Sequence, residues 1–266
     1  LWGLATFHMD QDLDGIENKA EFLGKVYAEA TERISEKPEY EEAFKVLQKK
    51  FEAGDAMLTA LWEKTKRWSM DEFESIYRQL GVVFDVYFYE STEEVAGKKL
   101  LPELLEKGIV EQSAGAIIAN LEAYGLGVLV LVRKDGSALY GLKDIPLARE
   151  KFEQYGIEKS IVVVDIRQSL YFKQLFKILE LYGFHKEMVH YGYEFVSLKG
   201  GESMSSRKGN IIPARLLIGQ ALEKVRKQFP ESPDPLAIAL GAIRFAMLRH
   251  SAGSKIEFDI EESMRL

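Results

Sequence analysis

Apolar residues recur at three- and four-residue spacing through the first 80 residues, which is the period of an amphipathic helix. The pattern predicts helices at residues 20–34, 40–53, 57–66 and 71–80. Ser69 or Asp71 is expected to cap the last of these helices, and Gly81 to end it. The chain is therefore expected to begin with a helical segment.

After residue 80 the pattern alternates between strands and helices. Residues 82–89 and 160–165 are rich in β-branched and aromatic side chains, and the second run suits a strand buried on both faces of a parallel sheet. Further strands are predicted at 109–111, 116–120, 128–133 and 187–198, and helices at 98–107, 145–155, 169–181, 214–228 and 235–250. This alternation favours an α/β fold in which helices cover a parallel sheet.

Composition narrows the chemistry. The chain has 266 residues, of which 47% are hydrophobic and 29% charged, and it contains no cysteine. Disulfides, cysteine-ligated zinc and thiol catalysis are therefore excluded. No apolar run approaches the length of a membrane span and no signal peptide is visible, so we expect a cytoplasmic protein without a membrane partner.

An acidic turn near the start has the spacing of a calcium loop. Asp10, Asp12 and Asp14 alternate, and Glu21 stands at the twelfth position of the pattern. However, Glu17 occupies a position that is usually apolar. The alternative is a turn whose acidic residues cap the next helix, and the sequence leaves both interpretations open.

A glycine- and serine-rich loop at 199–210 carries the most informative chemistry. The net charge of the chain is −7, yet residues 199–228 hold seven Lys or Arg against two Asp or Glu. The hydroxyls of Ser205 and Ser206 can donate to phosphate oxygens, and Arg207 and Lys208 can neutralise their charge. The residues alone leave phosphate binding and an ordinary solvated loop as alternatives.

The segment Met204-Ser-Ser-Arg-Lys-Gly-Asn210 resembles the Lys-Met-Ser-Lys-Ser signature loop of class I aminoacyl-tRNA synthetases, in its arginyl-tRNA synthetase form. Four other segments resemble that family in the same order, namely 84–91, 133–144, 168–181 and 193–198. The resemblance is good over residues 80–266 and weak over residues 1–80.

This resemblance implies a Rossmann-like parallel sheet with helices on both faces, preceded by a helical segment. The implied domains are a helical connecting segment at 1–80, the second half of a catalytic core at 81–240, and the start of a junction to an anticodon-binding domain at 241–266. The implied reaction forms arginyl-adenylate from arginine and ATP, with Mg²⁺ accompanying ATP, and transfers arginine to its tRNA. No tightly bound cofactor and no resident metal is expected, and the protein is expected to be monomeric.

The resemblance also assigns residues. Met204, Ser205, Ser206, Arg207, Lys208 and Gly209 would bind ATP, with Lys208, Ser205 and Ser206 as the catalytic members. Glu90, Tyr140 and Asp144 would face the guanidinium of arginine, and Gln168 its α-amino group. A guanidinium presents a planar fork of donors and prefers carboxylate acceptors.

Three of these four arginine-binding candidates also have an ordinary interpretation. Asp144 precedes Ile145 and Pro146, so it could simply be a helix N-cap. Tyr140 could be an ordinary strand aromatic, and Glu90 a solvated carboxylate at the end of a strand.

Several departures from the family leave a rival function open. Ser203 stands where the signature has its first lysine, and Tyr89 stands where a glycine is usual. Ser206 replaces the second lysine, as the arginine family commonly shows alongside a lysine at the position of Lys208. The ATP-binding His-Ile-Gly-His motif of the family would precede Leu1, and its anticodon domain would follow Leu266. We therefore expect no aminoacylation by the isolated chain. The alternative is a non-catalytic fragment or paralogue that binds nucleotide, arginine or tRNA. A synthetase for another amino acid is a weaker candidate.

Overall fold

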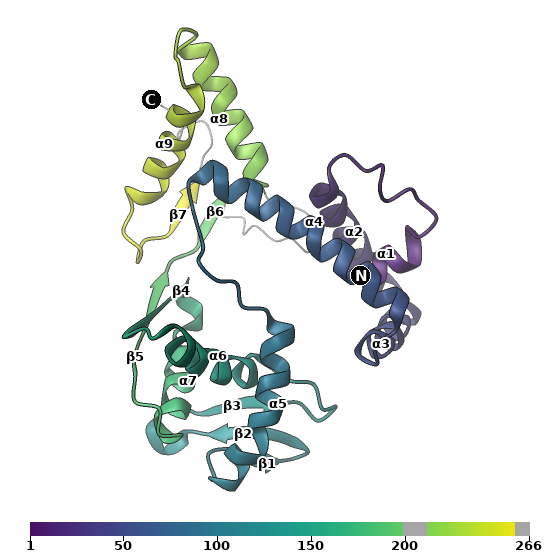
Figure 1. Cartoon of the computed structure of the whole chain (residues 1–266), viewed down its shortest axis with the longest axis vertical. Helices are drawn as coiled ribbons and strands as arrows, with labels where there is room; N and C mark the ends of the chain where they lie inside the picture. Colours follow the sequence, from purple (N-terminus) through teal and green to yellow (C-terminus); the bar gives the residue numbers. More distant parts are fainter. Residues whose placement is uncertain (199–211, 259–266) are drawn as a thin grey trace. The chain divides into compact units, whose positions relative to one another are not determined.

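The computed structural model describes residues 1–198 and 212–258 (Figure 1). The predicted signature loop, with its ATP-binding residues Met204, Ser205, Ser206, Arg207, Lys208 and Gly209, lies outside the described residues. The chain divides into two compact units. One comprises Leu1–Val83, Val196–Arg249 and the end of the chain from Glu257, and the other comprises Phe84–Phe195 with residues 250–256.

Helices at both ends of the sequence build the first unit. They are α1 (Trp2–Phe7), α2 (Lys19–Glu36), α3 (Pro38–Glu52), α4 (Ala56–Leu80), α8 (Ala214–Gln228) and α9 (Pro235–Leu248). The helix predictions for this unit are confirmed apart from the break expected within α4, and α1 was not predicted. Leu4, Val26 and Leu61 form a small core between α1, α2 and α4. A second core joins α8 to α9 through Ala221, Val225 and other apolar residues.

Helix α4 is one continuous helix of 25 residues, so the predicted division into 57–66 and 71–80 is wrong. Its N-cap is Asp55, whose side chain accepts the amide of Leu58 at 3.0 Å. Ser69 instead donates its hydroxyl to the carbonyl of Thr65, inside the helix. The polar residues around position 70 are compatible with helix, and the chain has no glycine or proline there to end it. Gly81 ends the helix in the left-handed conformation, as predicted.

The second unit is α/β. It contains α5 (Glu90–Glu106), β1 (Glu111–Ser113), β2 (Ala116–Asn120), β3 (Val128–Val132), α6 (Tyr140–Tyr155), β4 (Lys159–Asp165), α7 (Ser169–Leu181) and β5 (Glu187–Tyr193), with short 3₁₀ turns η1 (Glu122–Tyr124) and η2 (Ile166–Gln168). Strands β1, β2 and β3 form an antiparallel sheet. Strands β4 and β5 pair in parallel, with Val162 opposite His190, and α7 connects them. The α/β class is therefore confirmed.

Two strand predictions need correction. Residues 82–89 form no strand, and Val83 is 87% exposed. β-rich composition alone does not make a strand without a neighbouring strand to accept its hydrogen bonds. Strand β4 is present, but Ile161 and Val163 are 57% and 59% exposed, so the described residues bury only its other face.

The predicted strand at 187–198 is interrupted. Strand β5 ends at Tyr193, and β6 (Val196–Leu198) then pairs with β7 (Ile256–Phe258). At the interruption the amide of Glu194 donates to the carbonyl of Ala252 at 2.7 Å. The chain therefore changes its hydrogen-bonding partner between the two strands.

Glycines let the elements of the second unit approach closely. A side chain at Gly97 of α5 would overlap the carbonyl oxygen of Leu142 in α6. A Cβ at Gly141 would lie 2.5 Å from Cδ2 of Leu131 on β3. Around these contacts the core is continuous, and its fully buried members include Leu104, Leu131, Leu142, Ile145, Ile178 and Leu179. Helix α6 is therefore held by main-chain packing against α5 and by side-chain packing against β3.

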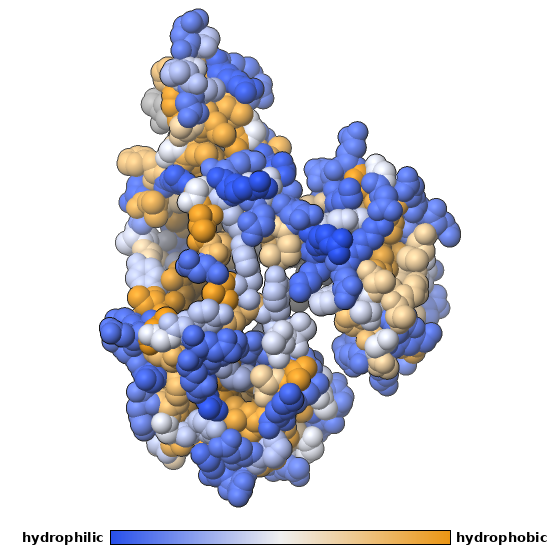
Figure 2. Space-filling model, viewed as in Figure 1, coloured by the Kyte–Doolittle hydropathy of each residue, from blue (hydrophilic) through white to orange (hydrophobic). Residues whose placement is uncertain are grey.

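Apolar residues also reach the surface, where they appear in orange in Figure 2. Among the described residues, no helix combines the length and apolarity needed to cross a membrane.

Candidate active site

The four residues predicted to bind arginine lie at or near the starts of three helices of the second unit. Glu90 is the first residue of α5 and Tyr140 the first of α6, whereas Asp144 lies one turn into α6. Gln168 ends η2 and immediately precedes α7. Side chains far apart in the sequence are therefore presented by neighbouring helix ends.

The structure overturns the ordinary interpretations of three of these residues. Helix α6 begins at Tyr140, five residues earlier than predicted, and its N-cap is Leu139. Asp144 is therefore no N-cap, and Tyr140 is a helical residue, 67% exposed, rather than a strand aromatic. Glu90 opens a helix instead of closing a strand.

Asp144 is held by a tyrosine from the next helix. The hydroxyl of Tyr171 on α7 donates to Oδ2 of Asp144 at 2.5 Å. Burial raises the pKa of Asp144, and the hydrogen bond from Tyr171 opposes that rise. Burial also raises the pKa of Tyr171, with the negative charge of Asp144 as a further cause. The pair is therefore a phenol that stays protonated beside a carboxyl whose charge depends on its neighbours.

Glu90 is engaged by a lysine from α6. Nζ of Lys143 lies 3.3 Å from Oε2 of Glu90 and 3.1 Å from Oε2 of Glu94. Burial acts to lower the pKa of Lys143, but its hydrogen bonds to Glu94 and Glu90 outweigh burial and raise the pKa. The negative charge of Glu90 in turn contributes to raising the pKa of Asp144. The structure thus brings Glu90 and Asp144 into one electrostatic neighbourhood.

Gln168 lies where parallel α/β sheets present ligands, just beyond the carboxyl end of β4. The preceding turn is organised by Asp165, which accepts the amide of Arg167 at 2.8 Å and pairs with its guanidinium at 2.7 Å. The side chain of Gln168 is exposed. Among the described residues, no hydrogen bond joins that side chain to Glu90 or Asp144, so the structure groups Glu90 with Asp144 but does not tie Gln168 to them.

Sequence reasoning missed Lys143, Tyr171 and a buried acid, Glu93, in this neighbourhood. Glu93 is only 4% exposed. Burial raises its pKa, and the negative charges of Glu150 and Asp144 add to the effect. The available signal was the spacing of Glu90 and Glu93, which places both on the first turn of one helix.

The acidic turn at residues 10–21 is organised by the protein itself. Oδ1 of Asp12 accepts the amides of Asp14 and Gly15, and Asp14 pairs with Lys64 at 2.6 Å. Helix α2 is capped by Asn18, not by an acidic residue. Within residues 1–198 and 212–258, no group of three or more acidic or histidine side chains is placed to hold a metal ion.

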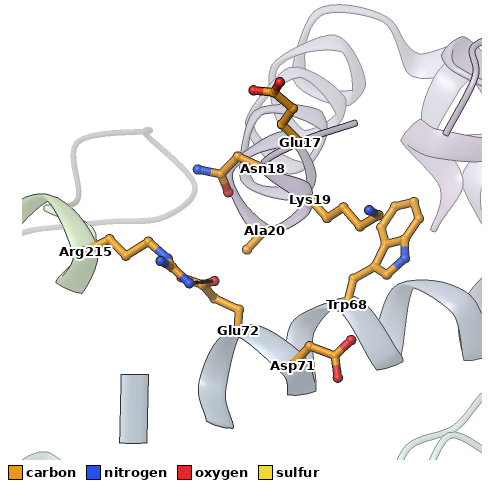
Figure 3. A pocket seen from close by; sticks show the side chains of 8 residues that line it. All are labelled: Glu17, Asn18, Lys19, Ala20, Trp68, Asp71, Glu72 and Arg215. Atoms are coloured by element: carbon orange, nitrogen blue, oxygen red, sulfur yellow. Dashed lines mark hydrogen bonds and ion pairs between the residues drawn. The ribbon is translucent and has the colours of Figure 1, made fainter. Parts of the chain in front are cut away.

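A pocket of about 400 Å³ lies in the first unit (Figure 3). Its lining comprises Glu17, Asn18, Lys19, Ala20, Trp68, Asp71, Glu72 and Arg215. Arg215 points at Glu72 and forms a two-pronged ion pair with it at 2.5 and 2.6 Å. Lys19 lies over the ring of Trp68, 5.6 Å from its centroid. These charged groups already have partners in the chain, so we assign no ligand to the pocket.

Comparison with known proteins identifies the family of this chain. A family model described as "tRNA synthetases class I (R), catalytic domain" matches residues 3–255. The arginine–tRNA ligase of Bdellovibrio bacteriovorus is 35% identical over 267 residues, covering 93% of this chain and 46% of that protein. The arginine–tRNA ligase of Clostridium perfringens is 33% identical, covering 91% of this chain and 44% of that protein. The chain thus spans less than half the length of these relatives.

Solved structures agree in fold. The arginyl-tRNA synthetase of Thermus thermophilus has a TM-score of 0.75 and 24% identity, covering 99% of this chain and 51% of that one. The arginyl-tRNA synthetase of Plasmodium falciparum has a TM-score of 0.69 and 20% identity, covering 85% and 41%. Because the family model matches nearly the whole chain, the resemblance seen in the sequence is confirmed: the chain belongs to the arginine-specific class I tRNA synthetases and represents part of their catalytic domain.

Proposed function

We propose that the protein containing this chain is an arginine–tRNA ligase, and that this chain supplies its arginine-binding side chains. The observation that carries the proposal is the grouping of Asp144 and Glu90 on adjoining helix ends, around a tyrosine and a lysine. A half-buried carboxylate beside a second, more exposed one suits a guanidinium, which carries five donors in a plane.

In the proposed first step the carboxylate of arginine attacks the α-phosphorus of ATP. The bond to the β-phosphate oxygen breaks, so arginyl-adenylate and pyrophosphate form. A hydroxyl at the 3′ end of the tRNA then attacks the arginyl carbonyl, and AMP leaves. No side chain has to act as nucleophile, and the protein contributes positioning and charge neutralisation.

The signature loop would hold ATP. In this proposal Met204, Ser205, Ser206, Arg207, Lys208 and Gly209 surround its phosphates. Lys208 supplies the main positive charge, while Ser205 and Ser206 donate hydrogen bonds. Mg²⁺ enters with ATP and shares in neutralising its phosphates. Loss of the Lys208 charge would therefore slow the first step without touching arginine recognition.

Arginine recognition is proposed to divide between the two ends of the substrate. Asp144, Glu90 and Tyr140 accept from the guanidinium, and Gln168 accepts from the α-ammonium group. Lys143 is the local cation that Glu90 must exchange for substrate, and it keeps Glu94 as a partner when Glu90 turns away.

We propose further that residues 81–240 form the second half of the catalytic core and that residues 1–80 are a helical segment connected to it. Residues from 241 onward would begin the junction to an anticodon-binding domain. The ligase would work as a cytoplasmic monomer, with arginine, ATP and tRNA as its partners.

The test is ATP–pyrophosphate exchange by the full-length protein, with and without tRNA, across the twenty amino acids. Exchange is expected with arginine and with none of the other nineteen amino acids. Exchange with a different amino acid would refute the arginine assignment. If arginine binds but no amino acid supports exchange, the non-catalytic binding role suggested by Ser203 in the signature loop would replace the ligase.

A further inference from the structure

We propose that Tyr171 is a positioning residue of the arginine site: it fixes one oxygen of Asp144 so that the other is presented to the guanidinium. The inference rests on the proposed function and extends it to a residue that contacts Asp144 rather than substrate. Tyr171 and Asp144 come from different helices, α7 and α6, and meet at 2.5 Å. The bond therefore defines the orientation of the carboxyl relative to both helices.

The phenol is itself held in place. Its ring packs edge-on against Phe172, with centroids 5.1 Å apart. Phe172 is buried and stacks on His190 of β5 at 4.9 Å. Tyr171 is thus anchored through Phe172 to the parallel strand pair. Because the tyrosine cannot swing freely, its hydroxyl selects a single direction for the carboxyl group of Asp144.

The bond also acts on the charge of Asp144. Burial disfavours its ionised form, and so does the negative charge of Glu90 from α5. Glu93, also from α5, is near enough that the charge of Asp144 raises the pKa of Glu93. Lys143 and Lys151 from the helix of Asp144 favour its ionisation, as does the hydroxyl of Tyr171 from α7. A hydrogen bond to the charged form stabilises that form. Removing the hydroxyl therefore leaves Asp144 both less oriented and more easily protonated.

The same protein provides a matched comparison. Tyr182, just after α7, donates its hydroxyl to Oε1 of Glu103 at 2.8 Å. Nη1 of Arg149 donates to that hydroxyl at 3.0 Å. This is again a tyrosine–carboxylate bond between helices of the second unit, but none of these three residues is predicted to touch arginine. Tyr182→Phe removes an equivalent bond without touching Asp144.

The experiment measures arginine-dependent exchange against pH in the full-length protein, for wild type, Tyr171→Phe, Tyr182→Phe and Asp144→Asn. Tyr171→Phe is expected to raise the arginine KM about three- to tenfold while kcat stays within about twofold. In the pH profile of this variant, the acidic limb is the range where kcat/KM for arginine falls as the pH falls. This limb should move to higher pH by about half a pH unit or more. Tyr182→Phe should leave both the KM and the limb unchanged.

The outcomes separate the two proposals. If Asp144→Asn raises the arginine KM but Tyr171→Phe alters neither KM nor the acidic limb, the positioning role is refuted and the arginine site stands. If Asp144→Asn leaves the arginine KM unchanged, the arginine-binding role of Asp144 and the positioning role of Tyr171 are both refuted. Should Tyr171→Phe fail to fold, 3-fluorotyrosine at position 171 supplies a more acidic phenol of nearly the same shape. It should move the acidic limb to lower pH, and an unmoved limb overturns the proposal.

Discussion

Nζ of Lys143 lies 3.3 Å from Oε2 of Glu90, so the carboxylate predicted to meet a substrate cation already pairs with a cation of its own chain. The same ammonium lies 3.1 Å from Glu94, a carboxylate without an assigned substrate role. Lys143 therefore pairs with Glu90, a candidate ligand of arginine, and with Glu94, which can serve as the control position in mutagenesis.

Glu90→Gln is expected to raise the arginine KM about three- to tenfold, because an exposed carboxylate on a guanidinium contributes less than a buried one. Glu94→Gln breaks the other half of the Lys143 pair and should change KM less than about twofold. Arginine-dependent exchange at pH 8 measures both variants. Equal effects of the two substitutions would assign Glu90 to holding Lys143 rather than arginine.

Asp144→Asn is expected to raise the arginine KM at least about tenfold, because it sets an amide donor against the donors of the guanidinium. The amide oxygen can still accept from Tyr171, so the melting temperature should stay within a few degrees. Glu153→Gln, which affects an exposed carboxylate on the same helix paired with Arg149, is the control. An arginine KM that matches wild type would remove Asp144 from the site.

Gly97→Ala tests the approach of α5 to α6. The added methyl group would overlap the carbonyl of Leu142, so the free energy of unfolding should fall by about 1–3 kcal/mol. Gly24→Ala, inside α2 with open space around the glycine, should instead gain about 0.5–1 kcal/mol. Urea unfolding of both variants gives the comparison. If Gly97→Ala does not lower the free energy of unfolding, the two helices can move apart without cost, and the account of this contact is wrong.

The raised pKa of Glu93 is expected to make the free energy of unfolding fall with rising pH. Its pKa is raised above the ordinary 4.5, so the folded state binds the proton more tightly than the unfolded chain. The free energy of unfolding therefore falls as the pH rises from 4.5 through the folded pKa, and this contribution is constant above it. Glu93→Gln mimics the protonated acid and removes the loss.

At pH 7.5 Glu93→Gln should melt about 2–4 °C above wild type for each kcal/mol of relieved destabilisation, and at pH 4 the two should coincide. Glu94→Gln is the control of opposite sign, because a hydrogen bond to Lys98 lowers the pKa of Glu94. A Glu93→Gln protein that melts below wild type at pH 7.5 would contradict this account.

The sequence predicted elements well where local periodicity decides them. Helices α7 and α8 begin and end at the predicted residues, Ser169–Leu181 and Ala214–Gln228. It failed where tertiary partners decide: residues 82–89 have strand-like composition but form no strand. Helix α5 starts at Glu90 rather than 98, although Gly97 weakens helix propensity, because this glycine lets α5 pack on α6.

The site follows the same division. Glu90 and Asp144 were found through a motif resemblance, and the structure gives them a shared neighbourhood. Tyr171 and Lys143 were missed because their contacts with Asp144 and Glu90 join residues 27 and 53 positions apart. Such contacts arise only once α5, α6 and α7 have packed, and no short sequence pattern encodes them.

The absence of a side chain at Gly97 also bears on which ligands the site can discriminate. At Gly97 main-chain atoms set the separation of α5 from α6, and main-chain atoms cannot change rotamer to accommodate a ligand. The helix ends that carry Glu90 and Asp144 are therefore held at a nearly constant spacing. In the proposed site a cation of shorter or longer reach gains no compensating shift of the helices. Only side chains can adjust to it, and that of Asp144 is already held by Tyr171.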